Sequence, residues 1–167
     1  MTFSLKELIL NGDFGGIELE MPREAVENII GTFDDWWDSG NRSEIIDGIG
    51  RHGTLEFHFM DNELTLIWCD NLSHLYAGNV DFDSWFLKTA ANRKVDNAYS
   101  FSKLAKKLIK AKADFSVKHD EYNFIVTVVK SGATLYFENH ADETNRNKFY
   151  LVAFGKSIYT KPGMTGR

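Results

Sequence analysis

The sequence predicts an α+β protein built from two similar units, each a helix followed by antiparallel strands, with the units sharing or pairing their sheets. In each half of the chain, apolar residues recur first with helical spacing and then with strand alternation. The 167 residues, 43% apolar and 26% charged, suit one compact domain. We expect an acidic unit at residues 1–91, a basic unit at 98–160 and a loose tail at 161–167.

The first unit is expected to open with two helices. Ser4 and Glu7 have the spacing of a capping box ahead of an apolar run, and Asn11-Gly12 would end this helix. Pro22 suits the first position of the second helix, whose apolar stripe stops at Gly31. Each helix is therefore bounded by recognisable start and stop residues.

Strands are expected to follow an acidic, aromatic loop at residues 32–41. One strand is predicted within 43–50, and a clearer hairpin over 54–60 and 63–69, joined by the turn residues Asp61-Asn62. The alternation places Leu55, Phe57 and Phe59 on one face of the first arm, and His52, Thr54, Glu56 and His58 on the other.

The second unit is expected to contain the clearest helix, over residues 100–113. Five apolar residues fall at positions i, i+3, i+4, i+7 and i+8, namely Phe101, Leu104, Ala105, Leu108 and Ile109. Strands are predicted at 114–118, 122–130, 133–138 and 148–154, with a turn at Ser131-Gly132 and a polar loop at 140–147. A short helix over 84–91, capped by Asp83, and a polar connection at 92–97 would separate the units.

The net charge of −5 conceals a division between the halves. Residues 1–84 hold 4 basic and 17 acidic residues, a balance of −13, whereas residues 85–167 hold 15 and 7, a balance of +8. Two differently solvated surfaces would explain this division. An acidic face that meets a basic protein partner would explain it equally well, because complementary fields steer association.

The two halves also resemble each other and a known group. The segment 53–57 matches 132–137, and 64–67 matches 149–152, although chance similarity between hairpins is an alternative. Gly16-Ile17-x-Leu19-x-Met21-x-Arg23-Glu24-x-Val26-x-x-Ile29-Ile30-Gly31, followed by the hairpin residues, resembles the helix-plus-hairpin unit of the β-lactamase-inhibitory-protein and BamE group. A similar pattern occurs in small bacterial immunity proteins. The resemblance implies that the sheet face and loops grip a protein partner without catalysis.

The cysteine number, the absence of targeting patterns and the net charge predict the cellular compartment and the class of partner. The single cysteine, Cys69, rules out an internal disulfide, and the chain has neither a secretory signal nor a membrane-span pattern, so a cytoplasmic location and no membrane partner are expected. Five lysines on the 100–113 helix form a solvated face or a phosphate-binding one, and the acidic net charge favours no nucleic-acid partner. These lysines are Lys103, Lys106, Lys107, Lys110 and Lys112.

Candidate chemistry is limited to two residue pairs. Glu56 and His58 suit an acid/base pair or half a metal site, and Cys69 with His74 combines a nucleophile and a base. A polar strand face and a half-buried small residue are the structural alternatives for these pairs. We therefore expect no catalytic residues, no metal and no cofactor.

Trp36-Trp37 between acidic residues is the most suggestive local feature. Exposed Trp beside charge is a common interface anchor, although either ring could instead cover the core. The leading hypothesis is a cytosolic immunity protein that binds and occludes a basic toxin domain. The expected partner-binding residues are Asp34, Asp35, Trp36, Trp37, Asp38, Glu56, His58, Tyr136 and Tyr150. The alternatives are a small hydrolase or metal-dependent enzyme with a cleft between the units, and a dimerisation module.

Overall fold

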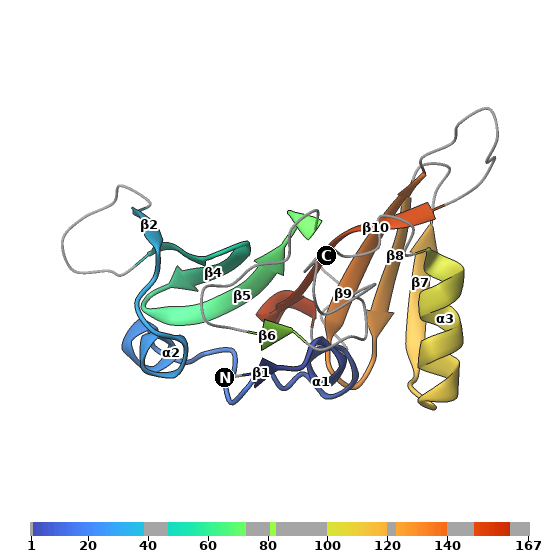
Figure 1. Cartoon of the computed structure of the whole chain (residues 1–167), viewed down its shortest axis with the longest axis horizontal. Coiled ribbons are helices and arrows are strands. Elements are labelled where there is room, and N and C mark those ends of the chain that lie inside the picture. Colours follow the sequence, from blue (N-terminus) through green and yellow to red (C-terminus); the bar gives the residue numbers. More distant parts are fainter. Residues whose placement is uncertain are drawn as a thin grey trace.

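The computed structural model describes residues 2–38, 47–72, 81–82, 100–119, 123–139 and 149–160. Within these residues it contains three α-helices, a two-stranded parallel pair and an eight-stranded antiparallel sheet, so the α+β class is confirmed (Figure 1). Most of the regular structure in these residues is sheet. The predicted 84–91 helix, the 92–97 connection, the 140–147 loop and the 161–167 tail lie outside the described residues.

The helices are α1 (Leu5–Asn11), α2 (Arg23–Ile30) and α3 (Phe101–Lys110), and a 3-10 turn, η2, spans Ile158–Thr160. The strands of the large sheet are β2 (Asp35–Asp38), β3 (Gly48–His52), β4 (Leu55–Met60), β5 (Glu63–Cys69), β7 (Phe115–His119), β8 (Asn123–Val128), β9 (Ala133–Asn139) and β10 (Phe149–Ser157). β1 (Thr2–Phe3) and β6 (Asp81–Phe82) form the parallel pair. No described helix has the length and apolar character needed to cross a membrane.

The helix boundaries follow the predicted capping residues. The Ser4 hydroxyl accepts a hydrogen bond from the Glu7 backbone N–H at 3.1 Å, and Gly12 ends α1 in the left-handed conformation with φ +79°. Pro22 is the N-cap of α2 rather than its first residue, and Gly31 ends that helix. α3 stops at Lys110, three residues before the predicted end.

The strand order in the large sheet is β2-β3-β4-β5-β10-β9-β8-β7. Strands β2 to β5 form one antiparallel meander, and β7 to β10 form another. The meanders join where β5 pairs antiparallel with β10, with Cys69 opposite Phe154 and Leu66 opposite Ser157. Residues from opposite halves of the sequence therefore lie side by side in the middle of one sheet.

The prediction of a loop at residues 32–41 is partly wrong, because Asp35–Asp38 forms the edge strand β2. This strand pairs with β3, which places Trp36 opposite Gly50 and Trp37 opposite Ile49. The sequence Asp-Trp-Trp-Asp has no apolar alternation, so only the pairing with β3 reveals the strand. The strand predicted within 43–50 is β3, which continues to His52.

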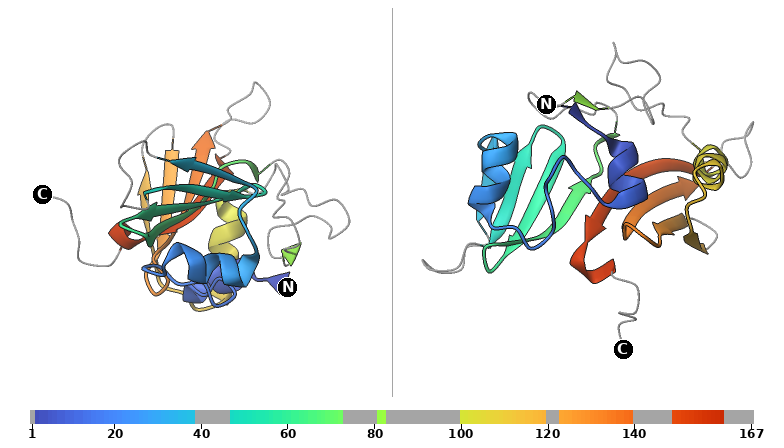
Figure 2. Two further views of the ribbon diagram at one scale, coloured as in Figure 1. Left: turned by 90° about the vertical axis from the view of Figure 1, so that its left-hand side faces the viewer. Right: turned by 90° about the horizontal axis from the view of Figure 1, so that it is seen from below.

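One face of the sheet carries the helices. The view from below in Figure 2 shows α1 in front of the middle of the sheet, with α2 at one end and α3, seen along its axis, at the other. Leu5 and Leu8 of α1, Val26 of α2, and Leu104 and Leu108 of α3 are all fully buried in one core cluster. They pack against alternate strand residues that include Phe57, Phe137, Leu135 and Phe154. The predicted apolar face of Leu55, Phe57 and Phe59 is thus the core face.

Glycines make room for aromatic rings against the sheet. A Cβ on Gly50 would lie 2.5 Å from two carbon atoms of the Phe33 ring, and a Cβ on Gly48 would lie 2.6 Å from the Trp36 ring. Rings that cover strand glycines restore the apolar contact that the missing side chains cannot supply. Phe33 in turn lies 5.6 Å from the Phe57 ring centroid, which links this edge of the sheet to the core.

Gly50→Ala should destabilise the protein by about 1–3 kcal/mol in urea unfolding, because the new methyl group collides with Phe33. The three nearest atoms that a Cβ at residue 50 would meet all belong to that side chain. In a Phe33→Ala background the same substitution should cost much less. Equal costs in both backgrounds would contradict this packing.

Candidate functional site

The opposite face of the large sheet carries no helix among the described residues, and we call it the helix-free face. Its side chains are those that alternate with the core residues, such as Glu56 and His58 between Leu55, Phe57 and Phe59 on β4. The strand register aligns Arg51, Glu56, Trp68 and Gly155 in one row across β3, β4, β5 and β10. The face is therefore continuous across the β5–β10 junction.

An aromatic pair lies at this junction. The ring centroids of Trp68 on β5 and Tyr136 on β9 are 5.2 Å apart in an edge-to-face arrangement. Strand β10 runs between β5 and β9, and a Cβ on its Gly155 would lie 2.7 Å from the Trp68 ring. Gly155 thus leaves the space in which the Trp68 ring reaches Tyr136. Both aromatic residues are half-buried, and burial raises the pKa of the Tyr136 hydroxyl.

Two pairs of polar side chains on the helix-free face hold each other in place. Nε2 of His58 lies 3.0 Å from Oε2 of Glu56, and Nη2 of Arg51 lies 3.4 Å from Oδ2 of Asp35. The Arg51 guanidinium also stands 5.0 Å from the ring centroid of Trp37. The helix-free face therefore combines aromatic rings with polar side chains that are fixed by contacts to neighbouring side chains.

The two predicted tryptophan anchors point to opposite sides of the sheet. Trp36 packs on the core side, with ring centroids 6.0 Å from Phe33 and 5.8 Å from Phe59. The Arg23 guanidinium lies 3.9 Å from its ring centroid. Trp37 is 45% exposed beside Arg51. Trp36 therefore covers the core, and Trp37 is the ring available to a partner.

The predicted aspartates have different surroundings in the fold. Oδ2 of Asp34 accepts a hydrogen bond from the Gly53 backbone N–H at 2.7 Å, and Asp35 pairs with Arg51. Asp38 ends β2 opposite Gly48. Asp34 and Asp35 thus have partners within the fold. Tyr150 lies on β10 opposite Glu138, and its side chain is outside the described part of the chain.

The histidines on the predicted polar strand face separate in the structure. His52 ends β3, while β4 begins at Leu55, so the two histidines occupy different strands. His52 is 6% exposed, and neither ring nitrogen has a hydrogen-bond partner among the residues that the structure describes. His58 stays on the helix-free face beside Glu56. The expectation that residues 52, 54, 56 and 58 share one strand face is therefore wrong for His52.

Cys69 is fully buried on the core side of β5. Burial, which disfavours the thiolate, raises the pKa of its thiol to about 12. His74, the base proposed for it, lies outside the described residues. Across the described ranges, no group of three or more His, Cys, Asp or Glu side chains is arranged to hold a metal ion.

Sequence reasoning missed Trp68 and Arg51 as members of the face. The signal for Trp68 was present, because it alternates with the buried residues Ile67 and Cys69 in the predicted hairpin. Arg51 could not be placed, because its role depends on the β2–β3 pairing that the sequence did not predict. Both residue types are enriched among the side chains that dominate protein interfaces.

Comparison of the chain with protein-family models, curated proteins and solved structures finds no match. A fold class by itself does not define a function. The side-chain arrangement on the helix-free face therefore carries the functional inference.

The folded protein should react with the thiol reagent DTNB at least roughly a hundredfold more slowly than the chain unfolded in guanidinium chloride. Thiolate is the reactive species, and the raised pKa keeps Cys69 protonated at the assay pH of 8. Absorbance at 412 nm follows the reaction. A native rate close to that of the unfolded chain would show that the thiol is accessible and ionised.

Proposed function

We propose that this chain is a bacterial protein-binding module, most concretely a cytosolic immunity protein that occludes a toxin, and that the helix-free face is its binding surface. The observation that carries the proposal is the half-buried Trp68–Tyr136 pair on the helix-free face of the sheet. Trp37 and Arg51 extend the same face toward the β2 edge.

The residue types on this face suit a protein partner. Trp, Tyr and Arg supply most of the binding energy at interfaces, where they are surrounded by polar groups that exclude water. Here the aromatic rings sit on paired strands, so little conformational entropy is lost when a partner docks. Because the Glu56–His58 and Asp35–Arg51 pairs already have internal partners, they would form the polar surround.

The two halves of the chain would act together in this mechanism. The first contributes α1, α2 and one four-stranded meander, the second contributes α3 and the other meander, and the Trp68–Tyr136 contact spans both. This arrangement agrees with the resemblance to the helix-plus-hairpin group, in which the sheet face grips a protein. A partner seated across the β5–β10 junction would contact both units at once.

Charge would assist the encounter with a basic toxin domain. The first 84 residues carry a balance of −13, which attracts a positively charged partner over several ångströms. Asp34 and Asp35 are engaged within the fold, so their role is to hold the β2 edge rather than to contact the toxin. Occlusion of the toxin's active site would then neutralise it without catalysis.

One observation favours an enzyme as a second candidate. The 3.0 Å contact between Glu56 and His58 has the geometry of a general base oriented by a carboxylate. The same contact is expected for two polar neighbours at i and i+2 on a strand face. The enzyme hypothesis therefore needs turnover that depends on His58.

Trp68→Ala and Tyr136→Ala should each weaken the complex with the toxin by at least about thirtyfold, since each removes a central aromatic anchor. A tagged copy of the chain would isolate the partner from its own cells, and titration calorimetry with the purified partner would measure the Kd. Protection of growth against the toxin should fall in parallel.

Ile109→Ala is the matched control for these variants. Ile109 is 67% exposed on α3, so its substitution also removes exposed apolar surface, but on the helix-bearing side. It should leave the Kd unchanged. Loss of affinity in Ile109→Ala, with Trp68→Ala binding normally, would place the interface on the helices. A stable complex of two copies of this chain alone would favour a dimerisation module.

His58→Gln should leave the hydrolysis of p-nitrophenyl acetate at the background rate of the unaltered chain. The binding proposal assigns the Glu56–His58 pair a structural role on the face, so no turnover depends on it. Release of p-nitrophenol gives the rate. Saturable turnover that disappears in His58→Gln would support the enzyme hypothesis instead.

A further inference from the structure

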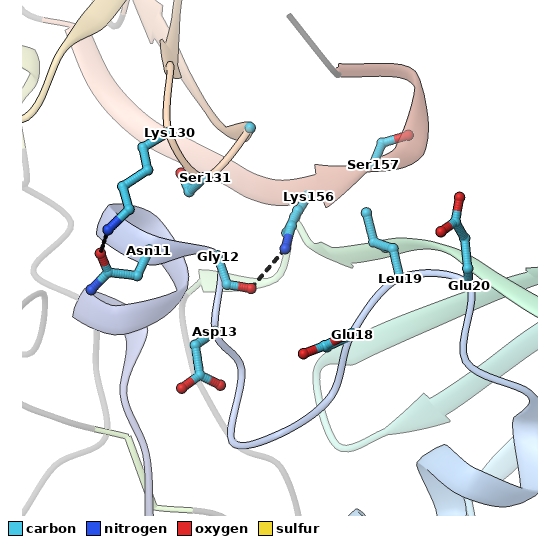
Figure 3. A pocket seen from close by; sticks show the side chains of 11 residues that line it. Asn11, Gly12, Asp13, Glu18, Leu19, Glu20, Lys130, Ser131, Lys156 and Ser157 are labelled. Atoms are coloured by element: carbon cyan, nitrogen blue, oxygen red, sulfur yellow. Dashed lines mark hydrogen bonds between the residues drawn. The ribbon is translucent and has the colours of Figure 1, made fainter.

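A second site lies on the opposite side of the molecule from the helix-free face. An open cavity of about 360 Å³ is lined by the segment that follows α1, the β8–β9 turn and the end of β10 (Figure 3). Gly12, Asp13 and Glu18 line it from the first segment, and Lys130 and Lys156 line it from the others. The two halves of the sequence thus build this cavity together.

Both lysines of the cavity are held by neutral oxygen atoms. Nζ of Lys130 donates to Oδ1 of Asn11 at 2.7 Å, and Nζ of Lys156 donates to the Gly12 carbonyl at 2.7 Å. An ammonium has three N–H donors, so each group retains capacity for a further acceptor. These hydrogen bonds orient two positive charges without neutralising them.

Lys156 is the more constrained of the two. Burial lowers the pKa of its ammonium, and the charges of Glu18 and Asp13 oppose that shift. These carboxylates are near enough to act on Lys156, yet neither forms an ion pair with it among the described contacts. Figure 3 shows the Asp13 and Glu18 carboxylates across the cavity from the lysine ammonium groups, and a third carboxylate of the lining, Glu20, beside Leu19.

Opposite charges that face each other without contact leave room for a molecule that carries both charges. An anion bound to the lysines would also lie near the carboxylates, and a cation bound to the carboxylates would also lie near the lysines, so each would meet repulsion from the opposite wall. A ligand with both groups meets an opposite charge at each end. The cavity volume lies within the range of roughly 300–1,000 Å³ that is usual for small-molecule pockets.

We propose that this cavity binds a small zwitterion of the α-amino-acid type. The ligand carboxylate meets Lys130 and Lys156, and the ligand ammonium meets Asp13 and Glu18. Gly12 is needed at the wall, because a Cβ there would lie 2.7 Å from Nζ of Lys156. The inference is independent of the proposed function, since the two sites share no residue.

Titration calorimetry with glycine, L-glutamate and L-lysine tests this site on the full chain, with acetate and ethylamine as its separate halves. At least one amino acid should bind, and acetate and ethylamine should each bind about tenfold more weakly or worse. Glu18→Gln and Lys156→Met should each reduce amino-acid affinity by about tenfold or more. Glu18→Gln preserves the size of the side chain, so it remains informative if Lys156→Met fails to fold.

Two controls separate the cavity from general charge effects. Glu24→Gln on α2 and Lys118→Met on β7 remove exposed charges outside the cavity lining, and both should leave binding unchanged. Three results would overturn the proposal: no binding of any of the three amino acids, acetate or ethylamine binding as tightly as the amino acids, or equal binding by Glu18→Gln and the unaltered chain.

Discussion

The pairing of β5 with β10 is the interaction on which the rest of the structure depends. It joins two four-stranded meanders, taken from opposite halves of the sequence, into one eight-stranded sheet. Because the register places Trp68 opposite Gly155, the Trp68 ring has space to reach Tyr136 across β10. The same junction brings Ser131 near α1, where its hydroxyl donates to the Ile9 carbonyl, and lets Lys156 bind the Gly12 carbonyl. Both faces of the sheet are therefore built from both halves of the chain.

Local patterns in the sequence were sufficient to predict most of the described helices and strands. Capping residues identified α1 and α2, and strict alternation identified β4 and the exact span of β5. Apolar spacing located α3, although its last turn ends earlier than the pattern suggests, with Lys112 at φ +55°. Strand β2 was missed because Asp-Trp-Trp-Asp has no alternating pattern and is stabilised by pairing with β3. The β5–β10 pairing is a contact between distant segments, for which local periodicity contains no signal.

The candidate site was predictable to a smaller extent. Strand alternation correctly grouped Glu56 with His58, and their side chains meet at 3.0 Å. It could not separate the roles of Trp36 and Trp37, because a residue's face is defined only once the strand and its neighbours exist. The aspartates near them were expected to contact a partner, and the sequence did not predict that Asp34 and Asp35 also bind Gly53 and Arg51 within the fold. These contacts depend on the folded backbone and on the β2–β3 pairing, so the sequence alone could not predict them.

The central claim is that a protein partner covers the helix-free face across the β5–β10 junction. Hydroxyl-radical footprinting of the chain, alone and in complex with its purified partner, tests this claim residue by residue. We expect oxidation of Trp37, Trp68 and Tyr136 to fall in the complex, while that of Ile109 on α3 and Tyr159 in η2 stays constant. Protection of Ile109 with unchanged oxidation of Trp68 and Tyr136 would contradict the account.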